Sequence, residues 1–89
     1  MASRQRVVVH GHVQGVGFRY TVAHAAQSRG AAGWVRNLPN GTVEAVFEAE
    51  PDVVESLVRL TRDGPRGASV QRVEIFEEEP QGLPGFEVR

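Results

Sequence analysis

Residues 7–19 read VVVHGHVQGVGFR and carry the chain from an expected strand into an expected helix. The valines favour a β-strand, because β-branched side chains pack well on a pleated surface. Glycine then recurs at positions 11, 15 and 17, and a helical pattern begins at Phe18. Glycine lets backbone N–H groups converge, and the first N–H groups of a helix lack partners. A strand, a glycine-rich loop and a helix start in this order predict a site for an oxyanion.

Arg19 follows this loop directly and offers a planar fork of donors that suits two phosphate oxygens. Two better-known phosphate loops are excluded. A Walker A loop needs a lysine, which the chain lacks, and the glycine spacing differs from the GxGxxG fingerprint. The loop by itself is equally compatible with a tight strand-to-helix turn that leaves Arg19 exposed.

Two motifs in the chain resemble the signatures of the acylphosphatase family. The first, VxGxVQGVxFR, spans residues 9–19, and the second, GWVRNxxxGxV, spans residues 33–43. The resemblance covers nearly the whole chain, and two motifs at the family's usual separation are more specific than either alone. One position departs from the pattern, because the family usually has a glycine six positions after Val43, where this chain has Ala49. The departure affects the backbone at the end of that strand and none of the matched polar residues.

The resemblance implies an enzyme that hydrolyses the carboxyl–phosphate bond of small acyl phosphates to a carboxylate and inorganic phosphate. It gives the phosphate-binding role to Arg19 and to the backbone N–H groups of Gln14, Gly15, Val16, Gly17 and Phe18. It makes Arg19 and Asn37 the catalytic residues, with Asn37 orienting a water for in-line attack on phosphorus. It implies no cofactor and no metal. Taken alone, Asn37 would be read as a residue preceding the turn at Pro39-Asn40-Gly41.

The hydrophobic pattern predicts strand, helix, strand, strand, helix and strand, with a tail that can add a short fifth strand. The expected strands cover residues 4–10, 34–38, 42–50, 68–78 and 86–89, and the expected helices cover 18–29 and 51 to just before Gly64. This is the order of the α+β, ferredoxin-like (βαββαβ) sandwich. It has an antiparallel sheet of four strands plus a short C-terminal fifth, with two helices on one face. We expect residues 1–89 to form a single acylphosphatase-like domain.

The same plan predicts where the two motifs meet. The first and second strands run parallel with the third between them, so their C-terminal ends lie about 10 Å apart at one edge of the sheet. The glycine loop leaves the first strand at that edge, and Asn37 lies near the end of the second. We therefore expect the loop, Arg19 and Asn37 to converge. Phe18, Trp34, Phe47 and Phe86 are expected in the core, and Val73 and Ile75 of the fourth strand are expected to point inward.

Composition excludes several classes of function. The chain has 89 residues, no cysteine and a net charge of −1, and all ten of its basic residues are arginine. Without cysteine there is no disulfide and no cysteine nucleophile, and the charge argues against a nucleic-acid partner. No apolar run approaches the length of a membrane span or a signal peptide. We expect a cytoplasmic monomer whose ligands are small acyl phosphates and, as product-like anions, inorganic phosphate or sulfate.

Three alternatives share the expected fold. A nucleic-acid module would need stacking aromatics in its central strands, and the first strand has none. A metal carrier of this fold would need a CxxC loop, which is absent. A non-catalytic anion-binding or regulatory module is the third, since acylphosphatase-like domains occur inside larger hydrogenase-maturation proteins. His10 and His12 can face the same way, but two histidines lack the third ligand of a catalytic zinc.

Overall fold

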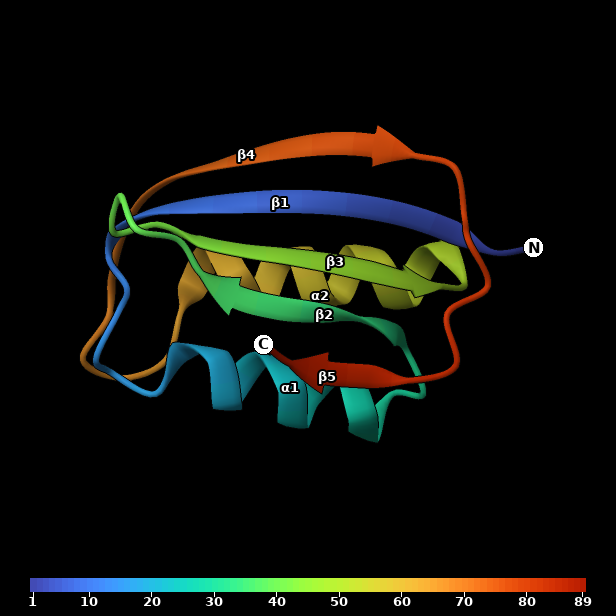
Figure 1. The fold of residues 1–89 in the computed structure, drawn as a ribbon, viewed down its shortest axis with the longest axis horizontal. Helices are drawn as coiled ribbons and strands as arrows, with labels where there is room; N and C mark the ends of the chain where they lie inside the picture. Colours follow the sequence, from blue (N-terminus) through green and yellow to red (C-terminus); the bar gives the residue numbers. More distant parts are fainter.

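Two helices pack on one face of a five-stranded sheet in the computed structural model, which describes residues 1–89 (Figure 1). The elements are β1 (Ser3–His12), α1 (Phe18–Ser28), β2 (Ala32–Asn37), β3 (Val43–Ala49), α2 (Pro51–Asp63), β4 (Ser69–Glu78) and β5 (Phe86–Val88). The strand order is β4-β1-β3-β2-β5, with β5 parallel to β2 and the other neighbours antiparallel. The ferredoxin-like prediction is confirmed, and the parallel fifth strand makes the sheet mixed.

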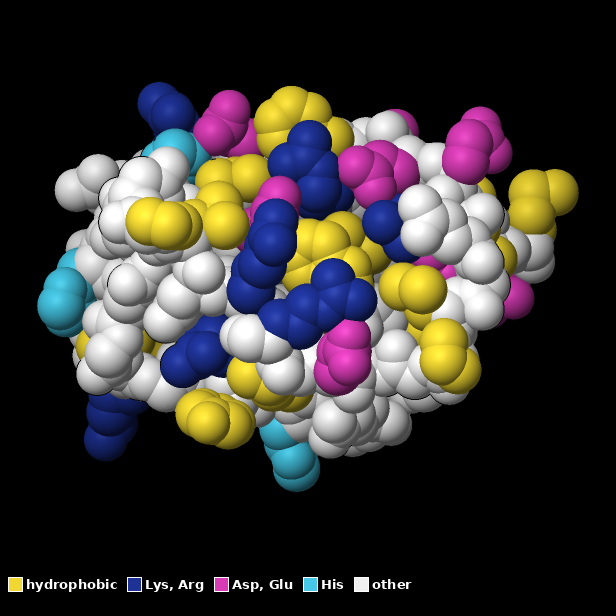
Figure 2. Space-filling model, viewed as in Figure 1, with side chains coloured by type: hydrophobic (Ala, Val, Ile, Leu, Met, Phe, Trp, Pro, Cys, Tyr) yellow, Lys and Arg dark blue, Asp and Glu magenta, His cyan; other side chains and the backbone are white.

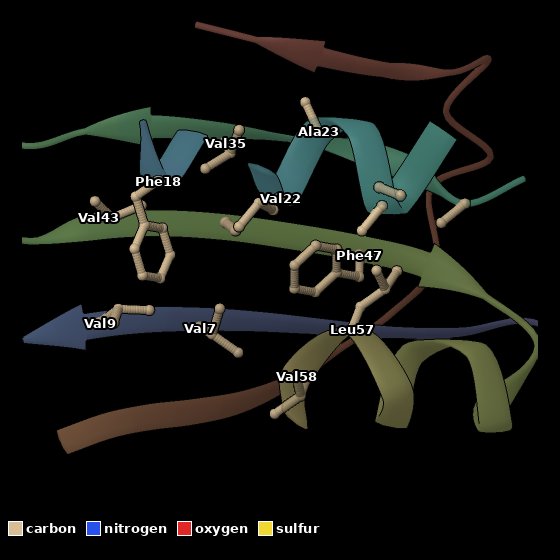
Figure 3. Close-up of a cluster of buried hydrophobic side chains, with 14 of the residues drawn as sticks. Val7, Val9, Phe18, Val22, Ala23, Val35, Val43, Phe47, Leu57 and Val58 are labelled. Carbon is tan, nitrogen blue, oxygen red and sulfur yellow. The ribbon is translucent and has the colours of Figure 1, made fainter. Parts of the chain in front are cut away.

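The apolar face of the sheet and the inner sides of both helices form the core (Figure 3). Val7, Val9 and Phe47 of the central strands meet Val22 of α1 and Leu57 of α2, and all five are fully buried or nearly so. Alternation along the strands and helical spacing along α1 and α2 bring these side chains to one layer. Burial of this apolar surface is the main source of stability for a domain that has no disulfide.

The first helix ends in a backbone cap at Gly30. The N–H of Gly30 donates to the carbonyl of Gln27 at 3.2 Å, and the N–H of Ala31 donates to that of Ala26 at 2.9 Å. This pair of bonds is a Schellman motif, and Gly30 has the positive φ of 70° that the motif requires. The helix ends at Ser28, one residue before the predicted end, because Arg29 is the C-cap.

One predicted core position is wrong. Trp34 lies on the open side of the sheet, where the centre of its ring is 5.0 and 4.8 Å from the guanidinium carbons of Arg36 and Arg89. Its neighbour Val35 is the one that points into the core. Ile75 points toward the helix side of the sheet, as predicted, but remains 37% exposed, because β4 is an edge strand that the two helices only partly cover.

The open face of the sheet is held by ion pairs rather than by a second layer. Arginine and acidic side chains gather together over this face (Figure 2). At their centre, Arg4 Nη1 lies 2.6 Å from Glu48 Oε2, and both side chains are about 6% exposed. Glu48 also accepts the backbone N–H groups of residues 81–83 at 2.9–3.2 Å, and Arg4 has a second partner in Glu78 at 2.9 Å. Glu48 thereby fastens the segment that leads into β5.

Replacement of Glu48 by glutamine tests this arrangement. We expect the free energy of unfolding to fall by about 2–3 kcal/mol, because a buried arginine loses one of its two carboxylates while Glu78 keeps part of the pairing. Urea denaturation of wild type and variant measures the difference. Glu55→Gln is the matched control, since it removes an exposed pair with Arg59 and should cost under about 0.5 kcal/mol. Equal losses in the two variants would contradict a special role for Glu48.

Acid should weaken the fold through the same carboxylates. Burial opposes ionisation of Glu48, but the hydrogen bonds from Arg4 and from residues 81–83 outweigh it and lower its pKa. Hydrogen bonds from Arg4 and Arg6 lower the pKa of Glu78. A lowered folded-state pKa contributes stability that is complete above the ordinary value near 4.5 and is lost as the pH falls through the folded value.

We therefore expect the free energy of unfolding to drop steadily between about pH 5 and pH 3. The drop should be smaller in Glu48→Gln, because that variant has one fewer carboxylate that must be protonated on unfolding. Denaturant titrations at each pH give both slopes, and identical slopes would rule out Glu48 as a source of the acid sensitivity.

Candidate active site

The loop between β1 and α1 presents a run of unpaired backbone donors. The N–H groups of residues 14–20 donate no hydrogen bond within the protein, and the first such bond of the helix runs from the N–H of Thr21 to the carbonyl of Gly17. Gly15 and Gly17 have φ values of 76° and 75°, in the left-handed region. A Cβ at either position would meet nothing within 4 Å, so backbone conformation rather than space calls for glycine. The loop and the positive end of α1 together form a nest suited to an anion.

Arg19 adds a positive charge beside these donors. Its Nη1 donates to the main-chain oxygen of Arg89 at 3.2 Å, and its guanidinium carbon lies 5.9 Å from the centre of the Tyr20 ring. No aspartate or glutamate side chain pairs with Arg19, in contrast to Arg4 and Arg6 on the sheet. The first turn of α1 also contains no acidic residue. The charge of Arg19 is therefore available to an incoming anion.

Asn37 is the last residue of β2 and faces the same site. Its Cα is paired with that of Val43, which on its other side is paired with Val9. The end of β2 therefore lies two strand spacings from β1, as the topology predicted, and the β2–β3 turn and the loop after β1 share one end of the sheet (Figure 1). The side-chain amide of Asn37 makes no hydrogen bond within the protein, and it is not fully buried. It can therefore bind a water.

One cavity of about 180 Å³ brings these groups together. It is lined by Val13, Gly15, Gly17, Phe18, Arg19, Tyr20 and Asn37. Two predicted site residues do not line it: the Gln14 side chain is bonded to the β2–β3 turn, and the Val16 side chain packs against the core. A larger hollow of about 600 Å³ lies between α2 and β4, but it contains none of the predicted residues and no comparable run of free donors.

Sequence reasoning missed Tyr20 and Val13 as lining residues. Tyr20 follows Arg19 in the first helical turn and is 67% exposed, so an aromatic ring stands at the mouth of the cavity. Its position next to Arg19 was the only signal that could have indicated this. Val13, which is almost fully buried, closes the inner wall.

His10 and His12 do not form a paired site. His10 Nε2 lies 2.6 Å from Glu74 Oε1, and this hydrogen bond, aided by Arg72, lowers the pKa of Glu74. No three side chains of the types His, Cys, Asp and Glu gather at spacings that could hold a metal ion. Neither helix has the length and apolar content required to cross a bilayer.

The fold and the site define a ferredoxin-like domain with a cavity between its first strand and its first helix, beside a run of unpaired backbone N–H groups. Comparison with known proteins identifies the family. The acylphosphatase family model matches residues 5–88. An acylphosphatase of Trichormus variabilis is 56% identical over 86 residues, which cover 97% of this chain and 85% of the relative. One from Thermococcus kodakarensis is 52% identical, covering 96% of this chain and 93% of the relative.

Solved structures agree with this assignment. The crystal structure of an acylphosphatase from Bacillus subtilis matches with a TM-score of 0.94 and 34% identity, covering 100% of this chain and 99% of that one. The chain therefore belongs to the acylphosphatase family, as its two motifs predicted, and it is an enzyme of the acylphosphatase type.

Anion binding at this cavity should stabilise the fold. Phosphate or sulfate bound only by the native state adds about 2.7 kcal/mol at one hundred times its dissociation constant. We expect Tm to rise with phosphate concentration in the wild type and much less in Arg19→Ala, measured by thermal unfolding. Arg62→Ala is the control, because Arg62 is an exposed arginine of α2 without an ion pair. A wild-type Tm that does not respond to phosphate would exclude the site.

Proposed function

We propose that this chain hydrolyses small acyl phosphates in the cavity between the 14–20 loop and Asn37, with Arg19 and the loop N–H groups holding the phosphate. The observation that carries the proposal is the convergence of three kinds of polar group on one cavity. These are the free N–H groups of residues 14–20, an arginine that pairs with no aspartate or glutamate side chain, and an asparagine amide without an intramolecular bond.

The anion nest would act on both the bound substrate and the transition state. A phosphoryl group in transfer spreads its charge over three equatorial oxygens, so catalysis depends on positioning and on electrostatic stabilisation. Donors fixed by the fold need no reorganisation during the reaction. Here the left-handed Gly15 and Gly17 hold the loop donors in place, and the rigid fork of Arg19 can engage two oxygens at once.

Asn37 would orient the nucleophile. Its Oδ1 accepts a hydrogen bond from a water molecule and so directs the water oxygen at phosphorus. The new P–O bond forms as the bond between phosphorus and the acyl oxygen breaks, and the electron pair of that bond leaves with the carboxylate. The water proton passes to a phosphate oxygen or to solvent. The products are a carboxylate and inorganic phosphate.

The leaving group explains why so few residues suffice. A carboxylate is the conjugate base of an acid with a pKa near 4, so it departs without protonation by a general acid. We accordingly expect activity that does not depend on a divalent ion. Inorganic phosphate and sulfate would bind as product-like anions. The cysteine-free chain fits a reducing compartment, and we propose a monomer that acts in the cytoplasm.

Arg19 and Asn37 should fail in different ways. Arg19 touches the phosphate before and during reaction, so Arg19→Ala should weaken phosphate inhibition and lower kcat together. Arg19→Lys should not restore activity, because a point charge cannot reproduce a bidentate fork. Asn37→Ala should lower kcat by about 10²–10³ with phosphate affinity nearly unchanged, the pattern of an interaction used mainly in the transition state. Steady-state hydrolysis of benzoyl phosphate with phosphate as inhibitor measures both quantities.

Circular dichroism and Tm of Asn37→Ala separate catalysis from structure, since Asn37 also precedes a turn. A folded Asn37→Ala enzyme with full turnover would reduce Asn37 to a turn residue. A wild-type chain that binds phosphate but hydrolyses no acyl phosphate would instead support the non-catalytic anion-binding alternative.

A further inference from the structure

The Gln14 side chain joins the two halves of the candidate active site. Its Nε2 donates to the carbonyl of Leu38 at 2.8 Å and to the carbonyl of Thr42 at 3.0 Å. Gln14 lies in the anion loop, whereas both carbonyls belong to the turn that follows Asn37. One side-chain amide nitrogen therefore donates two hydrogen bonds to the turn. Their acceptors lie 24 and 28 residues after Gln14 in the sequence.

No other hydrogen bond connects the loop at residues 13–17 with the turn at residues 38–42. The ladder between β1 and β3 ends at the pair of Val9 and Val43, below both segments. Beyond that pair β1 stays paired only with β4, as far as His12, so that the loop after β1 and the β2–β3 turn emerge separately at the same end of the molecule (Figure 1). The Gln14 amide is therefore the polar contact that sets the distance between the anion loop and the start of the turn.

The turn does not need Gln14 in order to form. The N–H of Leu38 donates to the carbonyl of Thr42 at 2.9 Å, and the N–H of Gly41 donates to that of Leu38 at 3.1 Å. A carbonyl oxygen has two lone pairs, so each oxygen accepts one bond from the turn itself and one from Gln14. Removal of the Gln14 amide would leave neither oxygen without a partner. The expected consequence is a looser relation between loop and turn, not an unfolded turn.

We propose that Gln14 is a positioning residue, whose side chain sets the place of Asn37 relative to the bound phosphate. The proposal rests on the proposed function of Asn37. In-line attack requires the reacting atoms about 3–3.5 Å apart with aligned orbitals, and a displacement of about 1 Å can cost 10²-fold in rate. Asn37 immediately precedes Leu38, one of the two residues that Gln14 holds. The backbone N–H of Gln14, expected to bind phosphate, is unchanged when the side chain is replaced.

Gln14→Met tests the link, because methionine keeps the length of the side chain and removes both donors. We expect kcat for benzoyl phosphate to fall about 10- to 100-fold, while the inhibition constant of inorganic phosphate changes by less than about twofold. Gln27→Met is the matched control. Gln27 also donates its Nε2 to a distant main-chain carbonyl, that of Phe86 at 3.3 Å, but far from the cavity. Its kcat should equal that of the wild type.

A double-mutant cycle with Asn37→Ala decides how Gln14 acts. If Gln14 works through Asn37, adding Gln14→Met to Asn37→Ala should lower kcat no further. Multiplicative losses would overturn the proposal, and so would an unchanged kcat in Gln14→Met or equal losses of kcat and phosphate affinity. If Asn37→Ala itself keeps full turnover, the proposed function of Asn37 fails. If Asn37→Ala is inactive and Gln14→Met is fully active, only the positioning role fails.

Gln14→Glu provides a second variant should Gln14→Met fold poorly. An ionised carboxylate would face two carbonyl oxygens without a donor, whereas the protonated acid can donate to one of them. The kcat deficit relative to wild type should therefore shrink as the pH is lowered. A deficit that is constant with pH would contradict a role for the hydrogen bonds.

Discussion

The antiparallel pairing of β3 with both of its neighbours is the constraint on which the site depends. Val43 stands opposite Val9 of β1 on one side and opposite Asn37 of β2 on the other. A shift of one residue in either ladder would turn every side chain of that strand to the opposite face. The buried valines of β1, β2 and β3 resist such a shift, because it would expose them to water. The register that buries the core therefore also brings Asn37 and the glycine loop to one edge.

The two faces of the sheet are stabilised in different ways, and this leaves Arg19 free. On the open face, the central arginines are paired with Glu44, Glu48 and Glu78. Arg19 lies beyond the end of the sheet, where no aspartate or glutamate side chain pairs with it. A chain with a net charge of −1 can thus present a local positive charge, because several of its acidic side chains are paired on the open face. The proposed anion site depends on charge distribution and not on net charge.

Much of the fold and part of the site could be predicted from the sequence. Strand and helix boundaries follow from the hydrophobic periodicity and from the glycine and proline residues that end each element. Most predicted ends lie within one or two residues of those observed. Arg19 and Asn37 could be singled out because they stand in two recognisable motifs, and the strand order places those motifs at one edge. Trp34 could not be placed correctly, because the residue type alone does not indicate which face of the sheet the helices cover. The partial exposure of Ile75 was equally hidden, because it depends on how far a helix extends over an edge strand.

The sequence by itself determined the order of elements, the glycine positions of the anion loop and the family to which the chain belongs, since these depend on local spacing and residue type. Only the tertiary structure decided which backbone donors remain unpaired, which arginines have no acidic side chain as a partner and where the Gln14 side chain ends. Gln14 stands in a motif as a loop residue, and nothing near it in the chain indicates that its amide reaches the carbonyls of Leu38 and Thr42. Such contacts join segments that are distant in sequence, and they exist only after the central ladders have brought those segments together.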